Sequence, residues 1–103
     1  MHPPIDSITL EGILHALSDP VRLAIFADIV FSQCAQNCTD LSSRVSERTI
    51  PKSTLSQHFK VLRDAGLIRS ERQGVECRNL SRYDEVERRF PGLLAAILTA
   101  VRS

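Results

Sequence analysis

The chain has 103 residues, of which 43% are hydrophobic and 24% are charged, and its formal net charge at pH 7 is +1. This length accommodates a single domain spanning residues 1–103, and the composition excludes a disordered polypeptide. No stretch approaches the ~20 apolar residues of a membrane span, and the N-terminal Met-His-Pro-Pro lacks the charged and apolar regions of an export signal. Three cysteines cannot all pair within one chain. We therefore expect a cytoplasmic protein without a membrane partner.

The small net charge conceals a separation of charge along the chain. Residues 1–43 hold five carboxylates and one cation, for a net charge of −4. Residues 44–82 hold nine cations and four carboxylates, for a net charge of +5. Concentrated positive charge is the electrostatic footprint of contact with nucleic-acid phosphates. The alternative interpretation is an ordinary solvated surface of mixed charge.

The N-terminal third predicts two helices. Apolar residues recur at helical spacing in a first helix over residues 5–17, namely Leu10, Ile13, Leu14 and Leu17. Asp19 is suited to cap a second helix whose first turn contains Pro20, where the missing N–H has no cost. Residues 21–30 of that helix are apolar nearly all round. We expect this helix to be the buried centre of the domain.

The next segments predict a helix-turn-helix over residues 39–65. Residues 32–37 are polar and aperiodic, and a short helix then starts at Cys38 or Thr39 with its apolar residues inward. Residues 48–51 form the turn into a second, more basic helix. Helix, short turn and basic helix in this order is the pattern of many DNA-binding domains.

The second of these helices carries the clearest functional pattern. Its inward stripe consists of Leu55, Phe59 and Leu62, and Gly66 ends it. Polar side chains fall largely off that stripe, namely Lys52, Ser56, Gln57, Lys60 and Arg63. Small hydroxyls, an amide and cations suit a major groove, where base edges offer donors and acceptors within short reach. We predict a DNA-binding helix, on which His58 is either a phosphate or base contact or a simple surface residue.

Residues 67–80 predict a β-hairpin that serves as a wing. Two strand-like segments, 67–72 and 75–80, flank Gln73-Gly74, where the glycine supplies the positive φ of a tight turn. Arg72 and Arg78 flank the tip and are candidates for contact with the DNA backbone or minor groove. Alternatively they only solubilise an exposed hairpin. The predicted fold is mainly α with a small β-hairpin: a winged helix-turn-helix of about five helices and a two-stranded wing.

A C-terminal helix is predicted over residues 91–101. Its apolar stripe consists of Leu94, Ile97, Leu98 and Val101. A helix of about eleven residues is too short to persist alone in water, so the stripe must pack on its own domain or on a second copy. Together with Leu10 and Leu14 of the first helix, it predicts a two-fold homodimer that uses both ends of the chain.

The sequence resembles the ArsR-type winged-helix transcriptional repressors. The likeness rests on ALSDPVRLAIFADI (residues 16–29), on STLSQHFKVLRDAGLIRSER (residues 53–72) and on the hairpin with Gly74. With the order of elements, it covers nearly the whole chain. The resemblance implies a homodimeric repressor that binds a palindromic promoter operator in double-stranded DNA and leaves when an effector binds. It implies major-groove contacts from Ser53, Thr54, Ser56, Gln57 and His58, and dimerisation through helices matching residues 5–17 and 91–101.

Two metal-binding patterns of that family are missing from this chain. Metal-responsive members carry a Cys-x-Cys pair where this chain has Cys38 alone, and zinc-binding members place histidine on the last helix, where this chain has none. We therefore assign no metal site and no cofactor. Cys34 and Cys38 are candidates for redox or electrophile sensing or for soft-metal binding, and an inert role is equally open. We expect Cys77 to pack on the inner face of the hairpin.

Two other functional classes are compatible with a domain of this size. A winged helix can be a protein-interaction module without specific DNA binding, although the basic balance of residues 44–82 disfavours it. An enzyme is disfavoured because the chain has four glycines, no phosphate-cradling loop and no legible catalytic arrangement. The sequence thus predicts a DNA-binding transcriptional regulator, with an unknown small-molecule or redox effector as a further partner.

Overall fold

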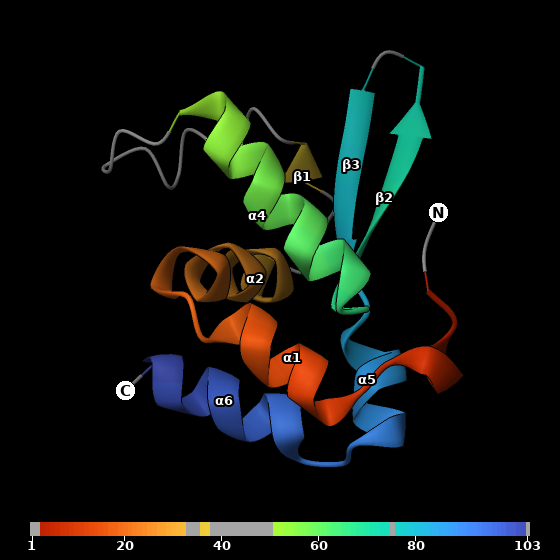
Figure 1. The fold of residues 1–103 in the computed structure, drawn as a ribbon, viewed down its shortest axis with the longest axis vertical. Helices are drawn as coiled ribbons and strands as arrows, with labels where there is room; N and C mark the ends of the chain where they lie inside the picture. The colour runs from red at the N-terminus through yellow and green to blue at the C-terminus, as the bar shows by residue number, and fades with distance from the viewer. Residues whose placement is uncertain (1–2, 33–35, 38–50, 75, 103) are drawn as a thin grey trace.

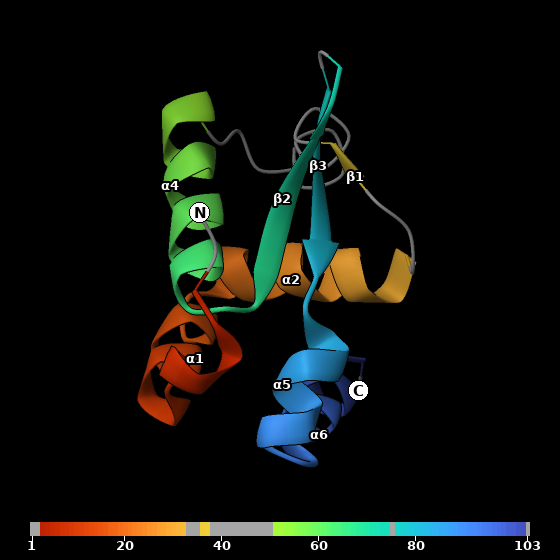
Figure 2. The same ribbon diagram turned by 90° about the vertical axis from the view of Figure 1, so that its right-hand side faces the viewer.

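The computed structural model describes residues 3–32, 36–37, 51–74 and 76–102 (Figure 1). Its elements run in the order η1 (Ile5–Ser7), α1 (Leu10–Leu17), α2 (Pro20–Ser32), β1 (Gln36–Asn37), α4 (Lys52–Asp64), β2 (Ile68–Gln73), β3 (Glu76–Ser81), α5 (Tyr83–Arg89) and α6 (Leu93–Arg102). In Figures 1 and 2, α4 and the hairpin of β2 and β3 rise from a base that contains α1, α5 and α6. The helices and the antiparallel hairpin of the described residues agree with the predicted winged helix-turn-helix.

The first helix is shorter than the sequence predicts. The single 3-10 turn η1 is followed by extended backbone at Ile8 and Thr9, and α1 begins only at Leu10. The Oγ1 atom of Thr9 accepts a hydrogen bond from the N–H of Gly12 at 3.0 Å and so caps α1. Ile8 is buried and lies so close to Gly66 that a side chain at position 66 would overlap it. The prediction of one helix over residues 5–17 is wrong, because burying Ile8 requires extended backbone before the cap.

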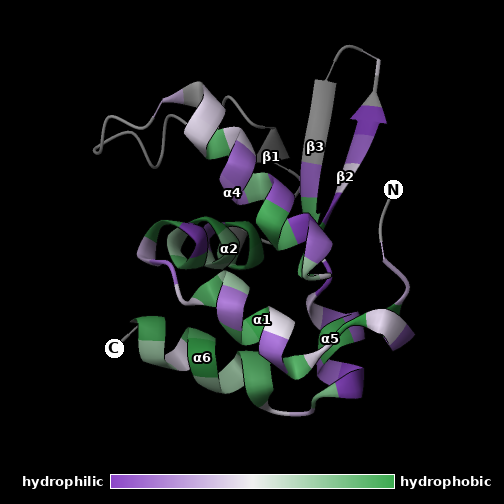
Figure 3. Ribbon diagram, viewed as in Figure 1, coloured by the Kyte–Doolittle hydropathy of each residue, from purple (hydrophilic) through white to green (hydrophobic). Residues whose placement is uncertain are grey.

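The second helix confirms its predicted start and its predicted burial. The Oδ1 atom of Asp19 accepts hydrogen bonds from the N–H groups of Val21 at 2.8 Å and Arg22 at 3.2 Å. The middle of α2 lies in the hydrophobic core, where Ile25 and Phe26 are fully buried. Figure 3 shows the contrast between this largely apolar helix and the hydrophilic strand β2.

The hairpin differs from the prediction in one detail and the sheet in another. β2 and β3 pair in an antiparallel register that ends at Gln73 opposite Glu76, so Gln73 belongs to the strand and not to the turn. Gly74 has the predicted positive φ, at 63°. The predicted two-stranded wing is present, and the two-residue strand β1 pairs with β3 and extends it to a three-stranded sheet of order β1-β3-β2. Two residues that pair through their backbone leave no hydropathy pattern by which the sequence could reveal them.

The C-terminal helix packs into the chain's own core. Leu94 is fully buried and Leu98 nearly so. The start of α6 is fixed by Glu87, whose carboxylate accepts hydrogen bonds from the N–H groups of Gly92 at 2.6 Å and Ala95 at 2.7 Å. α6 therefore begins at Leu93, two residues later than predicted. No helix in the described part of the chain is long and apolar enough to cross a membrane.

Candidate nucleic-acid interface

Helix α4 presents a polar face to solvent and an apolar face to the core. Its inward stripe is buried as predicted, with Leu55, Phe59 and Leu62 each at most 4% exposed. The exposed positions of the opposite face are Ser53, Thr54, Ser56, Gln57 and Lys60. Because three turns of the helix are anchored in the core, the donors and acceptors of this face are held on a rigid element. The hairpin stands beside α4 and projects in the same direction (Figure 2).

His58 lies at the inner edge of this face and is half-buried. It lines a shallow depression of about 310 Å³ between α4 and the start of α2, where Arg22 and Val61 also contribute. His58 also lies close enough to Asp19 for its charge to act on that carboxylate. The side chain is thus held against α2 and is less outward than the predicted contacts on either side of it.

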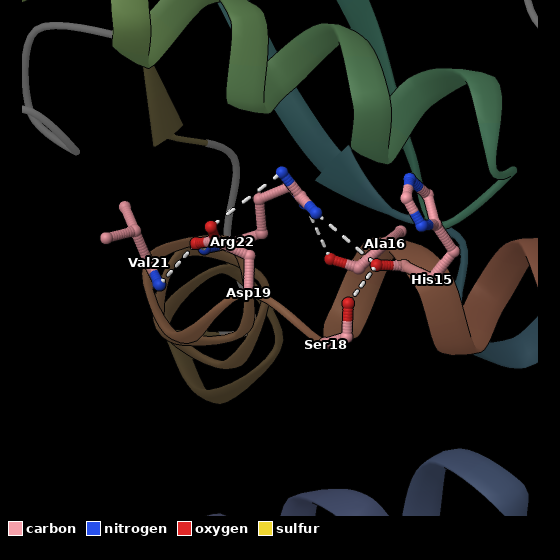
Figure 4. A network of polar contacts seen from close by, with 6 residues as sticks. All are labelled: His15, Ala16, Ser18, Asp19, Val21 and Arg22. Atoms are coloured by element: carbon pink, nitrogen blue, oxygen red, sulfur yellow. Dashed lines mark hydrogen bonds and ion pairs between the residues drawn. The ribbon is translucent and has the colours of Figure 1, made fainter.

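The corner between α1 and α2 is held by Arg22, for which the sequence predicts no role beyond its charge (Figure 4). Its Nε atom donates to the carbonyl of Ala16 at 2.7 Å, and an Nη atom donates to the carbonyl of His15 at 3.3 Å. The Oγ atom of Ser18 donates to the same carbonyl of His15 at 2.6 Å. These bonds satisfy carbonyls that the end of α1 leaves without a helical partner. The sequence could have indicated this role of Arg22 through Asp19-Pro20-Val21-Arg22, which places a capping residue and a cation within one helical turn.

The pKa of Asp19 lies below its ordinary value. Burial acts to raise it, but the backbone N–H groups of Arg22 and Val21 and the charges of Arg22 and His58 outweigh that effect. The carboxylate therefore binds a proton less readily in the folded chain than in the unfolded one. The cap it forms contributes stability above its ordinary pKa of 3.8 and loses that contribution as the pH falls through the folded value.

We expect Asp19→Ala to lower the free energy of unfolding by about 1 kcal/mol at neutral pH, because α2 loses its N-terminal acceptor. At acidic pH, as the pH falls below the ordinary pKa of 3.8, the two proteins should differ less, since protonation of the wild-type carboxyl removes the acceptor. Urea unfolding at both pH values measures this difference. Asp6→Ala, at an exposed carboxylate of η1, is the control. An equal loss of stability at both pH values would contradict the role of the ionised carboxylate.

Arg63, predicted as a DNA contact, is turned toward the hairpin. One Nη atom donates to the Oγ atom of Ser70 on β2 at 3.3 Å, and that hydroxyl donates to Oδ1 of Asn79 on β3 at 2.8 Å. Asn79 is fully buried and Arg63 is half-buried. This chain of hydrogen bonds joins the C-terminal end of α4 to both strands. It fixes the angle between the helix and the wing, a positioning role that helical spacing alone did not indicate.

Lys60 points outward and forms an ion pair with Asp64. Its Nζ atom lies 2.9 Å from Oδ2 of Asp64, and both side chains are about 60% exposed. An ion pair this exposed contributes little to stability. The pair matters for electrostatics, because the carboxylate of Asp64 lies beside the Lys60 cation on the α4 face.

The remaining predicted contacts fall partly outside what the structure describes. Arg72 is exposed on β2, opposite Cys77 in the strand register. Lys52 begins α4 and Arg78 lies on β3 opposite Glu71, but their side chains are outside the described set. The same holds for the side chain of Cys77. Cys34, Cys38 and the helix predicted from residue 39 also lie outside the described residues.

The residues predicted to form a dimer surface divide into two groups. Leu10, Leu14 and Val101 are 43%, 48% and 39% exposed, and Ile97 is half-buried. Leu94 and Leu98 are buried within the chain's own core. These two are therefore removed from the surface that a second copy could contact. Among the described residues, no group of three histidine, cysteine or acidic side chains could hold a metal ion.

Comparison with known proteins agrees with this architecture. Residues 17–71 match the family described as a helix-turn-helix domain. The HTH-type transcriptional repressor SmtB of Mycobacterium tuberculosis is 36% identical over 76 residues, which cover 72% of this chain and 52% of that protein. The chain thus spans about half the length of these curated relatives. An uncharacterized HTH-type transcriptional regulator of Bacillus subtilis, YceK, is 33% identical over 85 residues, 82% of each chain.

Solved structures show the same fold. HlyU from Vibrio cholerae superposes with a TM-score of 0.69 at 25% identity, covering 89% of this chain and 87% of that one. NolR from Sinorhizobium fredii superposes with a TM-score of 0.65 at 29% identity, covering 84% and 81%. By class, the molecule has the winged helix-turn-helix fold. It belongs to the ArsR/SmtB family of helix-turn-helix transcriptional regulators. Of these relatives, SmtB is named a transcriptional repressor and YceK a transcriptional regulator.

Proposed function

We propose that this chain is a homodimeric repressor that reads a promoter operator with α4. The observation that carries the proposal is the two-sided character of α4, which leaves hydroxyls and an amide exposed on a helix anchored by Leu55, Phe59 and Leu62. Two copies of the helix would enter successive major grooves about one helical turn apart. Base contacts come from Ser53, Thr54, Ser56 and Gln57, and phosphate contacts from Lys52, His58 and Lys60.

The wing holds the flanking DNA backbone in this proposal, through Arg72 and Arg78. Arg63 contributes indirectly, since its guanidinium donates a hydrogen bond to Ser70 and so orients the hairpin relative to α4. We extend the proposal to a single domain over residues 1–103, with the helix-turn-helix at 39–65 and the wing at 67–80. The chain acts in the cytoplasm, and an effector or the thiols of Cys34 and Cys38 release it from DNA.

The dimer forms through the base of the molecule. α1 and α6 both lie there, away from the tip of the wing (Figure 1). Among the described residues, the exposed large hydrophobic side chains of α1 and α6 are Leu10, Leu14 and Val101. Apolar side chains on the base bury hydrophobic surface when two copies meet and leave both α4 helices free.

Fluorescence anisotropy tests this function directly. The reduced protein is titrated into a duplex from upstream of its own gene and into a shuffled duplex of equal length, at one salt concentration. We expect the native duplex to bind about a thousandfold more tightly, the lower end for specific recognition. Weak and equal binding to both, or binding that ignores salt, would contradict the proposal and favour a protein-interaction module.

The ion pair on α4 gives a second expected result. Asp64→Asn removes the carboxylate 2.9 Å from Lys60, so that phosphates meet a stronger local positive field. We expect affinity to rise by roughly two- to fivefold on both duplexes at low salt, with the gain shrinking as salt rises. Asp84→Asn, at an exposed carboxylate of α5, is the control and should change affinity less. A specific gain on the operator alone would show that Asp64 acts through base readout instead.

A further inference from the structure

A cavity of about 820 Å³ lies apart from the α4 face. It is lined by the C-terminal end of α2, the base of the hairpin, α5 and α6, and it is partly open to solvent. Figure 2 shows that this end of α2 is on the far side of the sheet from α4. Its volume falls within the ~300–1,000 Å³ typical of small-molecule sites. DNA contact through α4 and the wing tip makes no use of this space.

One part of the cavity wall is apolar. It includes Ile29 and Phe31 from α2, Leu80 from β3 and Leu98 from α6. Phe31 is 41% exposed, although it is a large aromatic side chain at the end of the central helix. Binding of an uncharged part of a ligand against this surface is favourable, since it buries apolar area.

The other part of the wall carries three guanidinium groups. Arg82 is only 6% exposed and donates to the carbonyl of Pro3 at 2.8 Å and to Glu85 at 2.9 Å. Arg69 lies 3.4 Å from Glu71. Arg88 lines the same cavity and, among the described residues, has no carboxylate at ion-pair distance.

These three cations act on one carboxylate. The hydrogen bond from Arg82 lowers the pKa of Glu85, burial opposes it, and the charges of Arg82, Arg69 and Arg88 lower it further. The lining therefore has three cations against two carboxylates, Asp84 and Glu85. Arg82 and Arg69 are already paired, so Arg88 is the cation left to receive an anion.

We propose that this cavity binds a small organic carboxylate with an apolar body. The carboxylate pairs with Arg88, and the body lies against Phe31 and the neighbouring aliphatic side chains. A guanidinium recognises a carboxylate through two parallel N–H donors, so the site prefers the acid to an uncharged analogue of the same shape. The inference is independent of the proposed function, because it concerns binding in the absence of DNA.

Isothermal titration calorimetry of the DNA-free protein tests it. The probes are naphthalene-2-carboxylate and decanoate, with naphthalene-2-carboxamide as the uncharged analogue. We expect at least one carboxylate to bind with a Kd of about 1 mM or tighter, and the amide to bind at least about tenfold more weakly than naphthalene-2-carboxylate if that probe binds. Absence of binding by both carboxylates, or equal binding of acid and amide, would overturn the proposal.

Two arginines adjacent in α5 provide a matched pair of variants. Arg88→Gln should weaken carboxylate binding about tenfold and abolish the preference over the amide, whereas Arg88→Lys should retain part of it. Arg89→Gln is the control: Arg89 lies over the ring of Phe90, 5.2 Å from its centroid, and does not line the cavity. Equal effects of Arg88→Gln and Arg89→Gln would contradict the role of Arg88. Ala95→Phe, which fills the cavity from α6, should abolish binding of every probe, and retained binding would refute the location.

Discussion

Gln57→Ala should weaken binding to the operator by about 1–3 kcal/mol, roughly 5- to 150-fold, and leave binding to shuffled DNA almost unchanged. The side chain is exposed in the middle of the polar face of α4. Its amide offers a donor and an acceptor on one rigid group, which matches the pattern that adenine presents in the major groove. Anisotropy titrations of both duplexes at equal salt measure the ratio of the two affinities.

Lys60→Ala is the matched comparison, one helical turn away on the same face. A lysine that contacts only phosphate loses the same affinity on any sequence, and the slope of log affinity against log salt should fall by about one. If Gln57→Ala lowered both affinities equally, Gln57 would be a backbone contact, and base readout would have to come from Ser53, Thr54 or Ser56.

Leu14→Glu should convert the protein to a monomer and lower operator affinity by at least about 100-fold, because each half-site then binds without the avidity of its linked partner. Leu14 is 48% exposed on α1, so the substitution costs the isolated chain little. A carboxylate in the centre of an apolar interface is expensive, since it would be desolvated without a partner. Sedimentation velocity at micromolar concentration measures the oligomeric state, and anisotropy measures the affinity.

Glu11→Gln controls for the change of one charge unit on an exposed position of the same helix. It should remain dimeric and bind DNA at least as well as the wild type. A Leu14→Glu protein that stayed dimeric would exclude α1 from the interface. A wild-type protein that sedimented as a monomer would refute the two-fold docking as a whole.

Local sequence patterns by themselves determined several features of this protein. The spacing of Leu55, Phe59 and Leu62 defined the buried side of α4, because a helix brings residues three and four apart to one face. Asp19 marked the start of α2, since its short carboxylate reaches the first free N–H groups. Gly74 marked the wing turn, where a positive φ of 63° suits a residue without a side chain. Each feature depends on a few neighbouring residues, which is why the sequence alone determined it.

Only the tertiary structure decided what covers each apolar stripe and where each long side chain ends. A periodic stripe shows that one side of α6 is apolar, but not that Leu94 and Leu98 pack inside the same chain while Leu10 and Leu14 of α1 remain exposed. Arg63 follows the same rule, because its partner Ser70 lies seven residues ahead on a strand whose position relative to α4 depends on the whole core. The cavity beside Arg88 has walls from five elements, α2, β2, β3, α5 and α6, whose lining residues run from Ile29 to Thr99. Such features arise from packing between segments, and no local pattern encodes them.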